Sequence, residues 1–375
     1  MNRQPTAIDL FCGVGGMSLG FEQAGFNVLA AYDAEEFNVQ SHNLNFPRSK
    51  AFKADLSKQD ASDLRKLARI GRRNIDVVFG GPPCQGFSVG GRRDLNDKRN
   101  LLVFDFARLV RQFRPSYFVM ENVQGLMTEH SKPILDSFLR RVKRAGYGIV
   151  EPIRVLNASD FGVPQRRKRT IILGFLKDVP EPEYPDKCCD GNLTTHRSVV
   201  RDAIADLQIV EDHNNFFECD VFAGELPETQ SIYAKTMRGL IHCPTDFSIP
   251  REITVNRLTG CLRTRHSTTT TRRFKKTKQG TAEPISRYIR LSWDSVAPTL
   301  RAGTGVDRGS HTAPRPIHPS VPRCITTREA ARLHSFPDWF QFHETRWHGF
   351  RQIGNAVPPL LARAVAGKIA EALSK

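Results

Sequence analysis

Residues 7–16 read Ala-Ile-Asp-Leu-Phe-Cys-Gly-Val-Gly-Gly, and this stretch decides the fold. Its first five residues are mostly apolar and predict a buried strand. The glycines that follow allow a sharp turn, and residues 17–24 carry helical spacing that Gly25 stops. A strand, a glycine-rich turn and a helix form the opening of an α/β fold that binds a nucleotide cofactor.

The next strand, predicted over residues 28–32, leads directly into Asp33. This acid follows Gly13 by 20 residues, the place where a carboxylate can accept hydrogen bonds from ribose hydroxyls. The glycine pattern alone fits NAD enzymes as well as other nucleotide-binding proteins, and it also fits a simple tight turn.

Strands and helices then alternate as far as about residue 180, which predicts a mostly parallel, twisted sheet. The predicted strands are residues 75–79, 116–120, 148–155 and 170–174. The predicted helices are residues 60–70, entered through Ser57, and residues 101–113 and 133–145. Beyond Pro180 the pattern is irregular, apart from a short helix over residues 199–207 capped by Ser198. Regular helices return over residues 327–336 and from about 359 to 373.

Composition limits the class of protein. A chain of 375 residues with 39% hydrophobic and 25% charged residues is long enough for two domains with ordinary globular cores. It has no apolar run near the ~18 residues of a membrane span and no secretory signal. Its eight cysteines form no Cys-x-x-Cys pair, so we predict reduced thiols, no metal site and an intracellular location.

The formal net charge of +16 favours a polyanionic partner, and nucleic acid is the obvious one. The charge is uneven. Residues 176–230 hold 13 acidic and 4 basic side chains, whereas residues 251–290 hold 11 basic and 2 acidic ones. A concentrated basic block is typical of a phosphate-binding surface.

Residues 80–88 read Gly-Gly-Pro-Pro-Cys-Gln-Gly-Phe-Ser and follow a predicted strand. Two glycines allow a turn and two prolines stiffen the chain, so Cys84 is held on a loop at the carboxyl end of a strand. A thiol positioned there is a candidate nucleophile. The alternative is a small buried hydrophobic residue, as most free cysteines are.

Other polar residues are predicted either at the carboxyl edge of the sheet, beside Cys84, or in the basic block of residues 251–290. Glu121 follows the strand over residues 116–120, where it is either functional or an ordinary loop residue. Residues 165–169, Gln-Arg-Arg-Lys-Arg, carry four consecutive cations that favour an anionic partner. Residues 264–278 set arginines and lysines among hydroxyls, which predicts a phosphate-binding loop rather than a flexible linker. Residues 297–309 have a similar composition.

Taken in order, these stretches resemble the motifs of DNA (cytosine-5-)-methyltransferases. The resemblance covers nearly the whole chain except about residues 180–290. Cys12 stands where many members have alanine, and Asp33 where glutamate is usual. The matching stretches are residues 9–16, 83–85 (Pro-Cys-Gln), 121–123 (Glu-Asn-Val), 165–169, 328–333 with 336–337, and 354–359 (Gly-Asn-Ala-Val-Pro-Pro).

The resemblance implies a Rossmann-like fold of S-adenosylmethionine-dependent methyltransferases, with a mixed, mostly parallel sheet and a smaller target-recognition domain. The catalytic domain would then be discontinuous, with residues 1–180 and 325–375. Residues 181–324 would form the target-recognition domain, and DNA would lie in the cleft between the two.

The resemblance also implies a mechanism. Cys84 would add to C6 of a flipped-out cytosine, which activates C5 for the methyl group of S-adenosyl-L-methionine. Glu121 would stabilise the charge that develops at ring N3. Arg167 would hold the carbonyl oxygen of the base, and Arg169 would support Glu121 or the nearby loop.

The remaining implied contacts concern cofactor and DNA. Residues 86–100 would form a loop that closes over the base. The implied cofactor-binding residues are Phe11, Gly13, Gly15, Gly16, Asp33, Asp55, Pro82, Leu102, Asn355 and Val357. The predicted DNA-binding residues are Gln85, Ser88, Arg92, Arg93, Arg272, Arg273, Lys275 and Lys276.

We therefore predict a monomeric cytoplasmic enzyme that associates with the nucleoid through double-stranded DNA. The chain has no extra regulatory domain in view, which favours a bacterial restriction-modification enzyme with a cognate restriction endonuclease acting on the same site. Three alternatives are an NAD-dependent oxidoreductase, a methyltransferase that acts on tRNA, and a DNA-binding relative without activity. The first gives Cys84, Glu121 and residues 165–169 no role.

Overall fold

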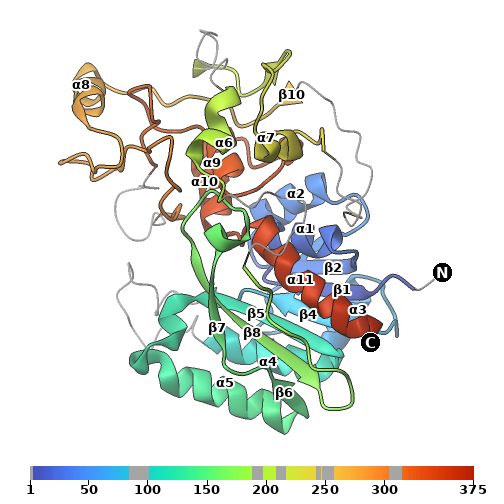
Figure 1. Ribbon diagram of the computed structural model, residues 1–375. Coiled ribbons are helices and arrows are strands. Elements are labelled where there is room, and N and C mark those ends of the chain that lie inside the picture. Colours follow the sequence, from blue (N-terminus) through green and yellow to red (C-terminus); the bar gives the residue numbers. More distant parts are fainter. Residues whose placement is uncertain are drawn as a thin grey trace.

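The computed structural model describes residues 3–83, 101–187, 197–207, 217–241, 246, 257–303 and 315–375. Figure 1 shows a twisted sheet covered by helices and, beside it, a less regular part formed largely by residues 197–303. In the part of the chain that the structure describes, no helix is both long and apolar enough to span a bilayer. The following predicted site residues lie outside the described residues: Cys84, Gln85, Ser88, Arg92 and Arg93.

The large sheet has eight strands in the order β3-β2-β1-β4-β5-β8-β6, and β7 also pairs with β8. The strands are β1 (Thr6–Leu10), β2 (Asn27–Asp33), β3 (Ala51–Lys53), β4 (Val77–Gly80), β5 (Tyr117–Val123), β6 (Tyr147–Ile149), β7 (Arg154–Asn157) and β8 (Lys168–Leu176). Strands β1 to β5 pair in parallel, whereas β8 runs antiparallel to β5, β6 and β7. The predicted mixed, mostly parallel sheet is confirmed.

Helices cover both faces of this sheet, and each face buries its own apolar cluster. On one face lie α1 (Gly16–Gln23) and α11 (Pro359–Ser374), whose Phe21 and Leu361 belong to the first cluster. The other face is covered by α3 (Ala61–Leu67), α4 (Leu102–Phe113) and α5 (Lys132–Arg144). Burial of these two faces is the main force that holds the sheet and its helices together.

The C-terminal helix returns to the start of the chain. A Cβ atom added at Gly20 of α1 would lie 2.5 Å from the Cβ of Ala362 in α11, so only glycine permits this close approach. Such packing is what a discontinuous catalytic domain requires, while the division near residues 180 and 325 stays a prediction.

Several predicted boundaries differ from the structure. Helix α3 begins after Asp60, whose carboxylate accepts from the amides of Ser62 and Asp63, so the predicted cap at Ser57 was wrong. A carboxylate is a strong cap because it satisfies amides that have no partner within the helix. Helix α6 (Val200–Ile204) begins after Val199 rather than Ser198, and residues 148–155 divide between β6 and β7. Helices α2 (Glu36–Asn45) and α10 (Arg346–Asn355) were not predicted.

The basic segment is a helix rather than the predicted loop. Helix α8 (Thr268–Lys276) starts after Ser267, whose hydroxyl accepts from the amide of Thr270. Four threonines lower the intrinsic helix propensity, and the one buried residue, Phe274, gives no visible period. The less regular part also contains α7 (Ile232–Met237) and a two-stranded sheet of β9 (Phe222–Ala223) and β10 (Arg257–Leu258).

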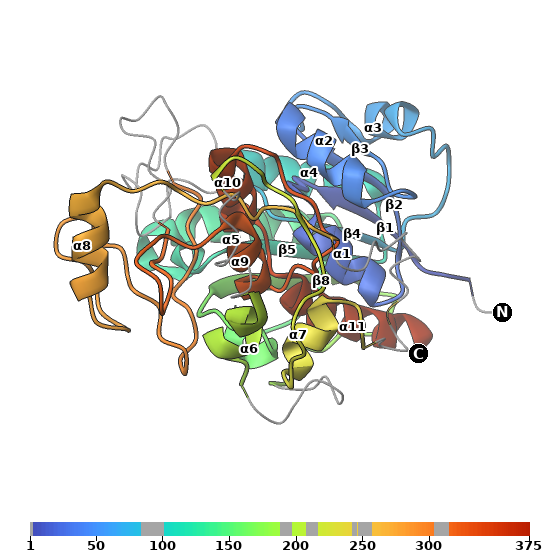
Figure 2. The same ribbon diagram turned by 90° about the horizontal axis from the view of Figure 1, so that it is seen from above.

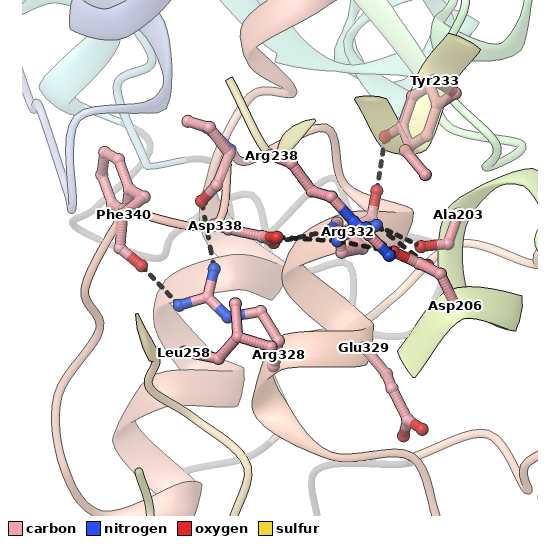
Figure 3. A network of polar contacts seen from close by, with 12 residues as sticks. Ala203, Asp206, Tyr233, Arg238, Leu258, Arg328, Glu329, Arg332, Asp338 and Phe340 are labelled. Carbon is pink, nitrogen blue, oxygen red and sulfur yellow. Dashed lines mark hydrogen bonds and ion pairs between the residues drawn. The ribbon is translucent and has the colours of Figure 1, made fainter. Parts of the chain in front are cut away.

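Helix α9 (Thr327–Leu333) holds the less regular part against the rest of the molecule through buried charges. Figure 3 shows Arg332 between two carboxylates. It bonds Asp338 at 2.5 and 2.7 Å and Asp206 at 3.3 and 3.2 Å. Arg328 donates to the carbonyl oxygen of Thr259 at 2.8 Å, so two distant chain segments meet one helix.

Glu329 of the same helix binds a third segment. Its carboxylate accepts from both terminal nitrogens of Arg323 at 2.9 and 2.8 Å, and His318 Nε2 lies 3.5 Å from it. Burial alone would raise the pKa of Glu329, but the Arg323 guanidinium outweighs it and brings the pKa to about 2. A fully ionised, fully bonded carboxylate is therefore part of the fold at neutral pH.

We predict that Glu329→Gln lowers the free energy of unfolding at pH 7 by on the order of 3 kcal/mol. Because the folded pKa lies below the unfolded value of about 4.3, the wild-type contribution is present above pH 4.3 and is lost as the pH falls towards 2. Denaturant unfolding between pH 7 and pH 2 measures both effects. The control is Glu371→Gln, whose carboxylate pairs with Lys368 at the surface. An unchanged pH dependence in Glu329→Gln would contradict the assignment.

Candidate active site

Three neighbouring parallel strands end at one edge of the sheet. Strand β4 lies between β1 and β5, and each of them carries one of the sequence motifs at its carboxyl end. Ligands of open α/β sheets bind at this edge. The glycine loop, the Gly-Gly-Pro-Pro stretch and Glu121 are therefore neighbours because of the strand order.

An ion pair between Glu121 and Arg169 forms the centre of the site. Arg169 Nε lies 2.6 Å from Glu121 Oε1, and the two side chains are only 13% and 10% exposed. Glu121 lies opposite Ile171 and Val123 lies opposite Arg169, so the paired side chains are diagonal neighbours on one face of the sheet. Burial lowers the pKa of Arg169, and the adjacent Glu121 carboxylate opposes this shift.

The same strand fixes the chain that leads to Cys84. A Cβ atom added at Gly81 would lie 2.7 Å from Glu121 Oε2, so a larger residue here would displace the carboxylate. Asn122 Nδ2 donates to the carbonyl oxygen of Pro82 at 3.2 Å. Asn122 thus holds Pro82 directly, two residues before the predicted nucleophile, and Glu121 lies close beside Gly81. The role of Asn122 was missed from the sequence, although its place beside Glu121 was the available signal.

The side chains of residues 165–169 point alternately outwards and inwards, as they do in an extended chain. Arg166 and Lys168 are exposed, whereas Gln165 and Arg167 are buried. Gln165 Nε2 donates to the carbonyl oxygen of Leu333 at 3.2 Å and bonds His334 Nδ1 at 2.9 Å. Alternate side chains of this motif therefore point into the molecule.

Arg167 is bonded to the backbone rather than facing the base site. Its guanidinium donates to the carbonyl oxygens of Leu300 at 3.0 Å, Gly354 at 2.7 Å and Ala356 at 2.8 Å, and the residue is 1% exposed. The expectation that Arg167 holds the carbonyl oxygen of the base does not agree with these contacts. Arg169, which reaches Glu121, is the better placed of the two arginines.

His334 is a neutral side chain that links Gln165 to the carbonyl oxygen of Ala356. Burial lowers its pKa well below the ordinary value, and the nearby Arg167 lowers it further. Its Nε2 lies 3.0 Å from the carbonyl oxygen of Ala356 and must donate, so Nδ1 accepts from Gln165. Arg167 and His334 together hold the C-terminal end of α10 and Ala356, and Gln165 holds His334 in place. The predicted cofactor residue Asn355 is the last residue of α10.

The glycine loop is tied to the second strand through Asp33. The Gly13 amide donates to Asp33 Oδ2 at 2.9 Å, while Oδ1 accepts from the Glu35 amide at 2.9 Å and from Asn38 at 3.1 Å. Burial raises the pKa of Asp33, and the bond from the Glu35 amide opposes the rise. Phe11, at the start of the loop, has a positive φ of 62°, which only the constraints of the turn make acceptable.

Glycines 15 and 16 are required by close neighbours, but Gly13 is open. A Cβ atom at Gly15 would clash with Phe46, and one at Gly16 with the carbonyl oxygen of Val357. A Cβ atom at Gly13 would meet nothing within 4 Å. The loop is therefore packed on its inner side and open at Gly13, which suits the approach of an adenosyl group.

The other predicted cofactor residues have contacts of their own. Asp55, just after β3, accepts from Ser57 Oγ at 2.6 Å and pairs with Lys58 at 3.0 Å; the bond from Ser57 lowers its pKa. Asn355 is exposed, and Leu102 begins helix α4. The structure thus joins Gly13 to Asp33 by a hydrogen bond and places Gly16 against the carbonyl oxygen of Val357.

A buried polar pair beneath the loop was also missed from the sequence. Asp9 accepts from Ser18 Oγ at 2.6 Å, and His42 Nε2 lies 3.2 Å from the same hydroxyl. Burial raises the pKa of Asp9 well above its ordinary value, and the bond from Ser18 opposes the rise. Asp9 lies within an otherwise apolar strand, so the sequence pattern alone indicates no partner for it.

This fold and site define an α/β enzyme with a nucleotide-type glycine loop beside an acid–arginine pair. The chain belongs to the family of C-5 cytosine-specific DNA methylases, whose model matches residues 6–371. The protein is therefore a DNA (cytosine-5-)-methyltransferase, as the sequence motifs predicted, and its fold is confirmed as Rossmann-like.

Individual relatives agree with this family. The chain is 47% identical over 372 residues to the type II methyltransferase M.XorII of Xanthomonas oryzae pv. oryzae, with coverage of 99% of this chain and 86% of the relative. It is 33% identical over 386 residues to the type II methyltransferase M.DdeI of Desulfomicrobium norvegicum, covering 96% and 88%. A solved structure assigned as a prophage-encoded DNA modification methyltransferase of E. coli superposes with a TM-score of 0.77 and 32% identity, covering 99% and 100%.

The two arginines provide a matched test. We predict that Arg169→Gln lowers the single-turnover rate of methylation by about 100-fold or more, with a moderate fall in Tm because buried Glu121 loses its partner. Arg167→Gln should lower Tm clearly, because it leaves buried carbonyl oxygens without donors. Thermal unfolding and single-turnover methylation of duplex DNA measure the two effects. If instead Arg167→Gln lowers the methylation rate and only Arg169→Gln lowers Tm, then Arg167 is the residue that contacts the base.

Proposed function

We propose that this enzyme methylates C5 of cytosine within one specific double-stranded DNA sequence, through a covalent bond between Cys84 and C6 of a flipped-out base. The observation that carries the proposal is the buried Glu121–Arg169 pair, which lies against Gly81 and therefore immediately before the Pro83-Cys84 motif. Cytosine inside a stacked duplex cannot reach this edge, so the base must leave the helix.

Cytosine C5 is too weak a nucleophile to react unaided. Addition of the Cys84 thiolate to C6 forms a carbon–sulfur bond and moves electron density onto C5. Glu121 stabilises the charge or proton at ring N3, and Arg169, held by that same carboxylate, donates to the carbonyl oxygen of the base. Loss of the C5 proton and breakage of the carbon–sulfur bond then release the methylated base and restore the thiolate.

The methyl donor that fits this site is S-adenosyl-L-methionine, which when bound supplies an electrophilic methyl group. The open side of the loop at Gly13 and the neighbouring carboxylate of Asp33 support the fit. Phe11, Gly15, Gly16 and Val357 would surround the donor. The residues that complete the proposed pocket are Asp55, Pro82, Leu102 and Asn355.

The relatives support a role in a restriction-modification system. M.XorII and M.DdeI are both named as type II methyltransferases. We infer that this chain protects a site that a cognate restriction endonuclease cleaves, that it acts as a monomer, and that it works in the cytoplasm on nucleoid DNA. The basic residues 251–290 support duplex DNA as the partner.

We predict that Cys84→Ser abolishes methylation while cofactor affinity stays within a few-fold of the wild type. A hydroxyl at ordinary pKa cannot replace the thiolate. Bisulfite sequencing of DNA from expressing cells measures methylation and gives the target sequence. Isothermal titration with S-adenosyl-L-methionine measures binding. Full methylation by Cys84→Ser would remove this residue from the nucleophile role.

Glu121→Gln tests whether Glu121 stabilises the charge or proton at ring N3 of the cytosine. We expect a fall in the single-turnover rate of about 100-fold or more with a much smaller change in the Kd for DNA. Glu36→Gln is the control, because Glu36 is an exposed acid whose pair with Lys53 is 3.8 Å long. A rate constant equal to that of the control would contradict the role given to Glu121.

A further inference from the structure

Helix α8 has two different sides. Phe274 is its buried residue, whereas five of its polar side chains are exposed. The last four of these residues follow the first by one, four, seven and eight positions. In an α-helix this spacing places all five on one face, opposite Phe274. The exposed face contains no acidic residue and consists of Thr268, Thr269, Arg272, Lys275 and Lys276.

The opposite side of α8 is firmly anchored. Phe274 packs in a small apolar cluster with Ile317 and Cys324. Arg290 Nη1 donates to the carbonyl oxygens of Phe274 at 3.0 Å, Lys275 at 3.3 Å and Thr277 at 3.0 Å, so one guanidinium caps the end of the helix. A segment that only gripped phosphates would not need to be held this rigidly, whereas recognition of base edges depends on fixed geometry.

One of the four predicted phosphate contacts belongs to this anchor. Arg273 Nε lies 3.5 Å from the buried carboxylate of Glu283, and its Nη2 lies 3.5 Å from Thr270 Oγ1. Arg273 is therefore turned towards the protein. Arg272, Lys275 and Lys276 remain on the exposed face, and Arg272 occupies its centre.

The position of α8 suits contact with a long, rigid partner. Figures 1 and 2 show it at the outer end of the less regular part, on the side away from α3 and from both termini. The chain enters β1 from the side of the N-terminus, so the carboxyl ends of the parallel strands β1, β4 and β5 face the side on which α8 stands. Glu121 lies near the carboxyl end of β5. Helix α8 therefore stands on the same side of the molecule as this edge.

We propose that α8 lies in the major groove of the duplex and that Arg272 reads a base there, which makes it a specificity-determining residue. This inference rests on the proposed function. An α-helix with its side chains is about 10–12 Å wide and the major groove about 12 Å. Arginine pairs with the two acceptors of guanine, and threonine contacts the methyl group of thymine. Lys275 and Lys276, nearer the anchored end, contact phosphates.

The test compares base preferences with and without Arg272. A randomised duplex library is incubated with full-length wild type or Arg272→Ala, and the retained duplexes are sequenced. We expect the variant to lose preference at one or two base positions by about 10-fold to 100-fold and to keep it at the others. Alanine favours the helix, and unchanged thermal unfolding shows that α8 persists.

Two further variants complete the experiment. Lys275→Ala with Lys276→Ala should weaken binding equally for all sequences and reduce the slope of log affinity against log salt by about 2. Lys66→Ala, which removes an exposed charge from α3, is the control. Uniform weakening by Arg272→Ala, or no change, overturns the base-reading role. The library experiment measures binding and does not depend on methylation. If the proposed chemistry is wrong, the wild type still selects a sequence but forms no 5-methylcytosine. If the base-reading role of Arg272 is wrong, the wild type and Arg272→Ala select the same sequence.

Discussion

The antiparallel pairing of β8 with β5 is the constraint on which the active site depends. Its register sets Val123 opposite Arg169 and Glu121 opposite Ile171, so that acid and guanidinium meet diagonally on one face. A shift of one residue would turn Arg169 to the other side of the sheet. Just before β8, Arg167 bonds the C-terminal end of α10 and Ala356, and Gln165 bonds His334. Residues 165–169 therefore join Glu121, the end of α10 and the end of α9.

The second constraint is the set of charges on α9. Arg328, Glu329 and Arg332 are fully buried, and removal of either partner from such a pair leaves an uncompensated charge away from water. Each side chain takes partners from a separate segment of the chain, near residues 206, 259 and 323. In its described residues, the less regular part has few regular elements of its own. The contacts of α9 therefore hold it beside the sheet. The segment of residues 297–300 adds a further link, because the carbonyl oxygen of Leu300 accepts from Arg167.

Much of the catalytic part could be predicted from the sequence because its strands are short, buried and separated by glycine or proline. The glycine loop with Asp33 twenty residues later and the order of motifs gave the class of enzyme. The roles of Arg167 and Arg169 could not be separated in this way. Both are arginines in one basic run, and only the partners across the sheet distinguish them.

Helix α8 shows a different limit. Its threonines disfavour a helix, and one apolar residue cannot reveal a period. Tertiary contacts from Arg290 and the Phe274 cluster stabilise it. The prediction that Ser57 caps α3 was wrong for a local reason. Asp60, three residues later, has a charged side chain that caps the helix instead.

The central claim is that a sulfur atom bonds to the pyrimidine ring before the methyl group is transferred. A duplex that carries 5-fluorocytosine at the target position tests it, because fluorine at C5 cannot be lost as a proton is, and the enzyme cannot release the methylated ring. With S-adenosyl-L-methionine present, we expect a denaturation-resistant complex whose mass equals protein plus methylated duplex, with the adduct on Cys84. If the methyl donor is bound and the site is the correct one, yet the protein and DNA separate completely in denaturant, the account is contradicted.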